Sequence, residues 1–388
     1  MRKTSVYLAL WSLLLVAGCT AGAQESGFPS RRPAQQPASP RTTLTVVAAG
    51  DLLVHPPLTD QAAADAHAMN RPGHDFGRVL AAVRPVISRA DLAICHMETP
   101  LAEPSGPFTG YPRFSVPPQL ADAAAQAGFD TCSTASNHSL DTGDEGIRRT
   151  LNNLDRVGLR HTGTARTPRE AATPNVLDVG GVKVAQLSYT LSLNGIQRSA
   201  PWTANLIDDS ANLIDAGAIL AEARRAREAG AEIVILSVQW GDEYRNEPNA
   251  DQLDLASELL ASPDVDLIVG HHVHVVQPIE KIGNKWVAYG MGNLTARFPD
   301  DSPEKTQDSV LPEFTFTKTG DRWAVSRVRV FAAFMEYRPE ARVVNLPGAT
   351  ADPAVPVERR AAYARIQQRI AGYVNMRGAA EAGLRMAQ

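Results

Sequence analysis

The sequence predicts a mixed α/β fold with a two-layered sheet core. Apolar, β-branched runs alternate with stretches of helical spacing along the chain, as they do in α/β proteins. Strand-like runs at 176–179 and 182–188 flank Gly180-Gly181, which predicts a compact hairpin. Hairpins mixed with such βα units favour two packed sheets over a closed barrel.

The first residues read as a secretory leader. A basic start precedes the apolar stretch Val6–Val16, which is far shorter than the ~20 residues of a membrane span. It ends in Leu15-Val16-Ala17-Gly18-Cys19, which resembles the lipobox of bacterial lipoproteins. We expect a signal peptide over 1–18 and a lipid anchor on Cys19 that holds the protein at the extracytoplasmic face of the cell membrane. The alternative is a plain signal peptide with a chance cysteine.

Three further segments follow the leader. Residues 19–41 hold prolines among Ala, Gln and Ser, and such a segment cannot bury a core, so we expect a linker. The folded domain is expected over 42–340. An Ala- and Arg-rich, helical extension is expected over 341–388.

The amino-acid composition limits the classes of protein to which the chain can belong. Of the 388 residues, 44% are apolar and 21% charged, which is ordinary for globular chains. The formal net charge of −4 provides no basic field, so nucleic acid is not an expected partner. Three cysteines are too few for a disulfide scaffold. Cys95 and Cys132 fall on separate predicted strands, where we expect two buried thiols; a disulfide is the alternative if the strands are neighbours in an oxidising compartment.

Hydrophobic spacing predicts the remaining elements in order. Strands are predicted at 44–49, 92–95, 129–132, 233–238 and 265–269. Helices are predicted at 76–89 (with a kink at Pro85), 119–127, 145–157, 212–229 and 250–260. Further hairpins are predicted at 279–288 and 314–330.

Polar side chains follow five of these strands at their carboxyl ends, where open α/β folds place ligands. The clusters are Gly50-Asp51, His96-Met97-Glu98, 136–141, 239–244 and 270–274. Five of the nine histidines lie in them, namely His96, His138, His271, His272 and His274. Carboxylate and amide oxygens with imidazoles suit Mn, Fe or Zn better than metals that require thiolate. The sequence therefore predicts a site for one or two divalent metal ions.

His272 and His274 are two residues apart. In extended backbone, side chains at this spacing point the same way and can serve one site. The alternative is a solvated loop.

Together these residues resemble a known family, the CapA proteins associated with capsule or poly-γ-glutamate biosynthesis, in the calcineurin-like metallophosphatase superfamily. The resemblance covers roughly residues 45–295, and the motifs occur in the family's order. They are Gly50-Asp51, His96-x-Glu98-Thr99-Pro100, Ser136-Asn137-His138-x-x-Asp141-x-Gly143, Gln239-Trp240-Gly241-x-Glu243-Tyr244, Gly270-x-His272-x-His274-x-x-Gln277-Pro278 and Tyr289-Gly290-Met291-Gly292-Asn293. The resemblance implies a four-layered α/β/β/α sandwich with a metal centre at the strand ends.

The resemblance also implies metal ligands. Asp51 matches the aspartate of the first strand, and Glu98 stands where an acid bridges two metals. Asn137 matches a ligand that binds through its amide oxygen, and His272 and His274 match the closing histidine pair. Two cations so held would clamp phosphoryl oxygens and lower the pKa of a shared water.

Two residues are implied in catalysis. His138 matches the histidine that stabilises the transition state or protonates the leaving oxygen in phosphatases. Asp141, three residues on, is placed to hold His138 in one tautomer.

Three positions depart from the pattern of the family. The opening Asp-x-His is missing, and His55, four residues after Asp51, either supplies the imidazole or caps the next segment. Gln239, a weaker ligand, stands where a metal-binding histidine is usual. His96 replaces an asparagine and either donates an imidazole to the metal or packs beside the ligands.

We therefore expect a metal-dependent, phosphoesterase-type hydrolase that acts on a phosphoester or related bond in an envelope polymer. Arg113, in a turn-like segment, either contacts the anionic substrate or belongs to an ordinary packed loop. The alternative function is a non-catalytic accessory protein that binds an anionic cell-envelope polymer.

Overall fold

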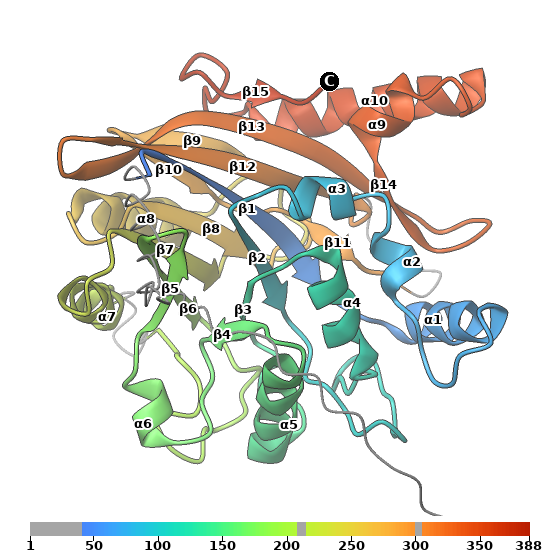
Figure 1. Ribbon diagram of the computed structural model, residues 1–388, viewed down its shortest axis with the longest axis horizontal. Helices are drawn as coiled ribbons and strands as arrows, with labels where there is room; N and C mark the ends of the chain where they lie inside the picture. The colour runs from blue at the N-terminus through green and yellow to red at the C-terminus, as the bar shows by residue number, and fades with distance from the viewer. Residues whose placement is uncertain (1–40, 208–214, 299–304) are drawn as a thin grey trace, which may run out of the picture. The chain divides into compact units, whose positions relative to one another are not determined.

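The computed structural model describes residues 41–207, 215–298 and 305–388 (Figure 1). The expected signal peptide, the expected lipid anchor on Cys19 and the expected linker up to residue 40 lie outside these residues. Arg41 forms an ion pair with Asp91, so the described structure begins at the end of the expected linker.

Nine strands of the described chain form a mixed sheet around β1 (Thr43–Leu52). β1 pairs in parallel with β2 (Leu92–Met97), followed in parallel by β3 (Thr131–Ser133) and β4 (Arg160–Thr162). On its other side β1 pairs antiparallel with β12, so a hairpin extends the sheet. The other members are β11 (Asn293–Thr295), β12 (Asp308–Thr319), β13 (Arg322–Glu336), β14 (Arg342–Asn345) and β15 (Arg385–Met386).

A second sheet contains six strands of the described chain, in the order β5-β6-β7-β8-β10-β9. β6, β7, β8 and β10 run parallel, whereas β5 and β9 join as antiparallel edges. The strands are β5 (Asn175–Val179), β6 (Val182–Thr190), β7 (Ile233–Gln239), β8 (Leu267–His271), β9 (Ile279–Ile282) and β10 (Lys285–Ala288).

Helices flank both sheets (Figure 1). They are α1 (Pro56–Ala68), α2 (Gly77–Leu80), α3 (Arg84–Ile87), α4 (Gln119–Ala127), α5 (Gly143–Arg156), α6 (Pro168–Ala171), α7 (Gly217–Glu228), α8 (Ala250–Ala261), α9 (Leu346–Ala351) and α10 (Val357–Val374). Among the described residues, no helix combines the length and the apolar character that crossing a membrane would need.

Successive side chains along the strands belong to different apolar clusters, which shows that the fold has four layers. In β1, Val46 and Ala48 belong to an apolar cluster between the two sheets, whereas Val47 belongs to a cluster beneath α1–α5. In β7, Ile235 faces the other sheet and Leu236 faces α7 and α8. Because successive side chains point to opposite faces, both sheets are buried on both sides. The four-layered α/β/β/α sandwich is therefore confirmed.

Most predicted elements are present, and the predicted helix 119–127 has the bounds of α4. The helix predicted over 76–89 is wrong as one element, because α2 ends at Leu80 and α3 begins at Arg84. Pro85 has no N–H to donate, and its ring would clash with the carbonyl of Ala81 in a continuous helix. It is accommodated instead in the first turn of α3.

The segment 341–388 is more than the expected helical extension. It contains α9 and α10, but β14 pairs with β13 along Arg342–Asn345, and β15 pairs with β13 through Arg385 and Met386. Tyr363 and Ile370 of α10 are buried in the apolar cluster that includes both sheets. This segment therefore completes the sheet and the core.

Cys95 and Cys132 form a disulfide, so the expectation of two thiols is wrong. β2 and β3 are parallel neighbours in which these two cysteines are register partners. His96 and Ser133 follow them directly, and Nδ1 of His96 lies 2.8 Å from Oγ of Ser133. The crosslink thus joins two strands just before they enter the polar edge of the sheet.

Reducing this disulfide should lower the free energy of unfolding by about 2–4 kcal/mol, because the crosslink restricts the unfolded chain. Urea unfolding of the wild type with and without a phosphine reductant measures the difference. The Cys95→Ala/Cys132→Ala double variant is the control, because reductant should leave its stability unchanged. Equal stability of the reduced and oxidised wild type would contradict the expectation.

Candidate metal centre

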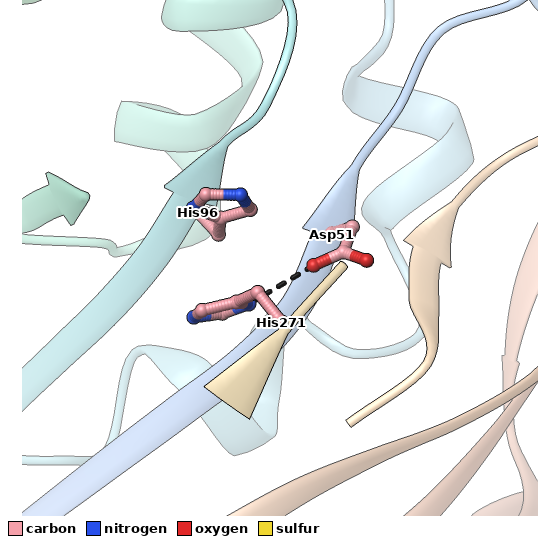
Figure 2. A group of neighbouring side chains, drawn as sticks. All are labelled: Asp51, His96 and His271. Carbon is pink, nitrogen blue, oxygen red and sulfur yellow. Dashed lines mark hydrogen bonds and ion pairs between the residues drawn. The ribbon is translucent and has the colours of Figure 1, made fainter. Parts of the chain in front are cut away.

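The polar residues predicted at strand ends meet at one edge, with contributions from both sheets. β1 carries Asp51, β2 carries His96 and leads into Glu98, and β8 of the other sheet ends at His271. Parallel strands bring their carboxyl ends to the same edge, so β1 and β2 deliver neighbouring side chains. Figure 2 shows Asp51, His96 and His271 converging from these three strands.

Asp51, His96 and His271 form one buried group whose potential ligand atoms lie within 4.8 Å of one another. Nδ1 of His271 is 2.9 Å from Oδ1 of Asp51. The rings of His96 and His271 stack with their centroids 4.1 Å apart. Because Nδ1 is held in both imidazoles, their Nε2 atoms remain free to bind a metal.

A second buried group shares Asp51 and adds Glu98 and His274, again within 4.8 Å. Nδ1 of His274 lies 3.3 Å from Oδ2 of Asp51 and 2.9 Å from Oδ1 of Asn293. Nε2 of His274 lies 3.7 Å from Oε1 of Glu98. The two groups therefore adjoin at Asp51, an arrangement suited to two neighbouring cations.

In the ligand groups, burial and neighbouring charges have opposing effects on the pKa values of the side chains. Burial disfavours the ionised form of Asp51, but the neighbouring imidazoles of His271 and His274 outweigh it and lower the pKa of Asp51 below its usual range. Burial raises the pKa of Glu98 well above its usual value. Burial opposes protonation of His274, yet Glu98 and Asp51 raise its pKa to about 10.

The donor set fits a divalent cation. Five buried atoms here have no hydrogen-bond partner among the described residues: Oδ2 of Asp51, Nε2 of His96, Nε2 of His271 and both carboxylate oxygens of Glu98. Buried polar atoms are normally paired, so a converging set of unpaired ones requires a ligand. Imidazole nitrogens with carboxylate oxygens suit Zn, Mn or Fe.

The structure differs from the expectation for His272. Its φ is +89° and that of His274 is +59°, so the two do not lie in the extended backbone that was assumed. His271 rather than His272 reaches Asp51, and His272 is in neither ligand group. The position of His271 at the end of its strand, like that of His96, was the available signal.

Asn137 and Gln239 bind each other. Nε2 of Gln239 donates to Oδ1 of Asn137 at 3.0 Å, and Oε1 of Gln239 accepts from the backbone N–H of Asn137 at 2.5 Å. Thr190 donates to the same Oε1 at 2.9 Å. Metal ligation by either amide therefore stays a prediction, and Gln239 is placed to orient Asn137.

His138 and Asp141 lie as the resemblance implied. Nδ1 of His138 is 2.7 Å from Oδ2 of Asp141, which also accepts the backbone N–H of Phe114 at 2.7 Å. The carboxylate thus holds the proton of His138 on Nδ1 and leaves Nε2 for chemistry. Ser136 places this turn against β2, because its Oγ donates to the carbonyl of Glu98 at 2.6 Å and accepts from the N–H of His138 at 2.9 Å.

Neither His55 nor Arg113 belongs to a ligand group. The ring of His55 packs 5.1 Å from Phe114 and 4.4 Å from Phe298, and its side chain makes no cap for α1. Its backbone carbonyl accepts the first hydrogen bonds of that helix. Arg113 is exposed in the loop that precedes Phe114.

Comparison with known proteins identifies the family. The family model described as "Bacterial capsule synthesis protein PGA_cap" matches residues 45–297, well over half of the chain. The chain belongs to this family. It is similar to "Capsule biosynthesis protein CapA" of Bacillus anthracis, with 24% identity over 82% of this chain and 74% of that protein. It is also similar to "PGA biosynthesis protein CapA" of Bacillus subtilis, with 30% identity over 53% of this chain and 52% of that protein. The expected resemblance to the CapA proteins is confirmed.

Two solved structures share its outline at low similarity. The calcineurin-like phosphoesterase YfkN of Bacillus subtilis covers 87% of this chain and all of its own at 13% identity, with a TM-score of 0.46. A phosphatase of Mycoplasma pneumoniae covers 77% of this chain and 95% of its own at 11% identity, also with a TM-score of 0.46.

His271→Ala should weaken Mn²⁺ or Zn²⁺ binding at least about tenfold, whereas His272→Ala should change it by no more than about twofold. The reason is that His271 contacts Asp51 and lies in a ligand group, and His272 does not. Competition with a chromogenic chelator measures both affinities, and circular dichroism checks folding. A greater loss in His272→Ala would overturn this assignment.

Metal affinity should rise with pH between about 6 and 8, by up to about tenfold per unit. A pKa of about 10 leaves His274 protonated below that pH, so binding through this imidazole must displace a proton. The raised pKa of Glu98 acts in the same direction. Calorimetry in buffers of different ionisation enthalpy measures the protons released. An affinity independent of pH would contradict the expectation.

Proposed function

We propose that the protein is a metal-dependent, phosphoesterase-type hydrolase of capsule or poly-γ-glutamate biosynthesis. The observation that carries the proposal is the buried pair of ligand groups around Asp51, next to the hydrogen-bonded His138–Asp141 pair. An ion with a purely structural role would need only metal ligands, without a neighbouring acid or base. An imidazole with an oriented, free Nε2 beside the ligands supports acid–base chemistry.

The residues divide into ligands and a proton carrier. Asp51, His96, His271, Glu98 and His274 would hold one or two of Mn, Fe or Zn. A divalent cation, when bound, draws charge from phosphoryl oxygens and makes water more acidic.

His138 would protonate the leaving oxygen from Nε2. Oδ2 of Asp141, 2.7 Å from Nδ1 of His138, stabilises the protonated ring and fixes its orientation. Arg113, exposed on the adjoining loop, would attract the anionic substrate. Because Phe114 packs its edge on His138 with centroids 4.7 Å apart, the loop and the proton carrier keep their relative positions.

We propose further that Cys19 carries a lipid anchor and that the protein acts outside the cytoplasmic membrane. The lipobox-like segment ending at Cys19 supports this, as does the family's association with capsule synthesis. A substrate in that compartment would be a phosphoester or related bond of an anionic envelope polymer.

A second candidate is a non-catalytic accessory protein that binds such a polymer. The mutual hydrogen bonds of Asn137 and Gln239 favour it, because they engage an amide oxygen that the resemblance assigns to metal binding. A similar protein of Mycobacterium tuberculosis bears the name "Probable polyglutamine synthesis accessory protein", at 27% identity over 42% of this chain.

The decisive experiment is reconstitution with Mn, Zn or Fe, metal analysis, and a phosphoesterase assay with an aryl phosphate. His138→Ala should reduce kcat by about 10²–10⁴-fold and leave the metal content unchanged, since it removes only the proton carrier. His161→Ala is a matched control: it breaks another His–Asp pair, in which Nε2 lies 3.1 Å from Oδ1 of Asp155, outside the centre. Its activity should equal that of the wild type.

Two outcomes would reject the hydrolase. One is the absence of stoichiometric metal after reconstitution. The other is no turnover at any metal load together with binding of poly-γ-glutamate that persists in His138→Ala. The second result would establish the accessory role.

A further inference from the structure

An anchored loop from Thr109 to Ser115 stands beside the proton carrier. Its ends pair with each other, because the N–H of Thr109 donates to the carbonyl of Ser115 at 2.9 Å and the N–H of Ser115 donates to the carbonyl of Thr109 at 3.1 Å. The N–H of Phe114 donates to Asp141, and Gly110 packs so closely on Pro56 that a Cβ there would overlap the proline ring. These contacts hold the loop in one position over the His138 side of the centre.

The tip of this loop presents an aromatic ring to solvent. Tyr111 is 79% exposed. Of the five large apolar side chains that are exposed in the described chain, the two aromatic ones are Tyr111 and Tyr244. Tyrosine is enriched among the side chains that contribute most of the energy at binding surfaces.

Tyr244 lies on the other loop that borders the centre. Its ring centroid is 6.0 Å from that of His274. Its φ of +65° is unfavourable for a side chain with a Cβ, and a hydrogen bond of 2.8 Å from its N–H to the carbonyl of Val273 holds it there. Tyr244 is 39% exposed, so part of its ring faces solvent beside His274.

We propose that Tyr111 and Tyr244 form an aromatic rim that binds the leaving group of the substrate, and that this leaving group contains a sugar ring. The inference rests on the proposed hydrolase function, and it adds the substrate class. The loop of Tyr111 is fixed to His138 and Asp141, which would protonate the leaving oxygen, so the rim adjoins the leaving group rather than the phosphoryl group. Tyrosine faces pack against the C–H face of a sugar, while their hydroxyls bond to its hydroxyls.

The test compares glucose 1-phosphate with glycerol 3-phosphate, which has hydroxyls but no ring. Both kcat/KM and binding by calorimetry are measured on Mn²⁺-reconstituted protein; His138→Ala serves as the background for binding if turnover interferes. The wild type should prefer the sugar phosphate, and Tyr111→Ala should reduce the preference about 3- to 10-fold. Tyr111→Phe should retain most of it, because the ring remains.

Two controls distinguish loss of the aromatic contact from a general disturbance of the fold or of the metal site. Tyr111→Ala should leave Mn²⁺ affinity and thermal stability unchanged, because the side chain is exposed and outside both ligand groups. Val357→Ala removes another exposed apolar side chain, at the start of α10, and should alter neither substrate.

Each result decides one question. Three results would overturn the proposed rim. They are a wild type that does not prefer glucose 1-phosphate to glycerol 3-phosphate, a preference that is unchanged in Tyr111→Ala, and binding of neither ester. If the wild type binds glucose 1-phosphate in a Tyr111-dependent way but hydrolyses neither ester, the rim stands and the hydrolase fails. If it hydrolyses both esters with the same ratio in wild type and Tyr111→Ala, the hydrolase stands and the rim fails.

Discussion

The contact of Asp51 with two imidazoles, a hydrogen bond with His271 and an ion pair with His274, is the interaction on which the centre depends. Asp51 belongs to the nine-stranded sheet, whereas His271 ends a strand of the six-stranded sheet and His274 follows it. A carboxylate that is only 1% exposed is costly to bury unless it is paired. The pairing therefore couples the alignment of the two sheets to the assembly of the ligand groups.

Close backbone packing makes that contact possible. The N–H of Asp51 donates to the carbonyl of Gly292 at 2.9 Å, and a Cβ on Gly50 would overlap that carbonyl. Gly270, just before His271, approaches the carbonyl of Tyr289 in the same way. The glycines directly before Asp51 and His271 let their strands approach a neighbouring segment, which brings these two side chains within bonding distance.

The polar groups at this edge fall into two kinds that support different roles. Asn137 is hydrogen-bonded to Gln239, and His138 to Asp141, so these side chains hold fixed orientations. Oxygens of Asp51 and Glu98 and the Nε2 atoms of His96 and His271 are buried without such partners, which suits them to a cation. A centre of this kind is organised by its surroundings before any ligand arrives.

The sequence by itself determined the α/β class, most strands and helices, and the edge at which the polar residues meet, because these follow from local hydrophobic spacing and from the shared direction of parallel strands. It also indicated Asp51, Glu98, His274 and the His138–Asp141 pair. Only the tertiary structure showed that His271 is the histidine that contacts Asp51, since the backbone turns to positive φ after β8, and periodicity does not report this. It likewise decided the disulfide, because Cys95 and Cys132 become partners only through the register of two strands 37 residues apart.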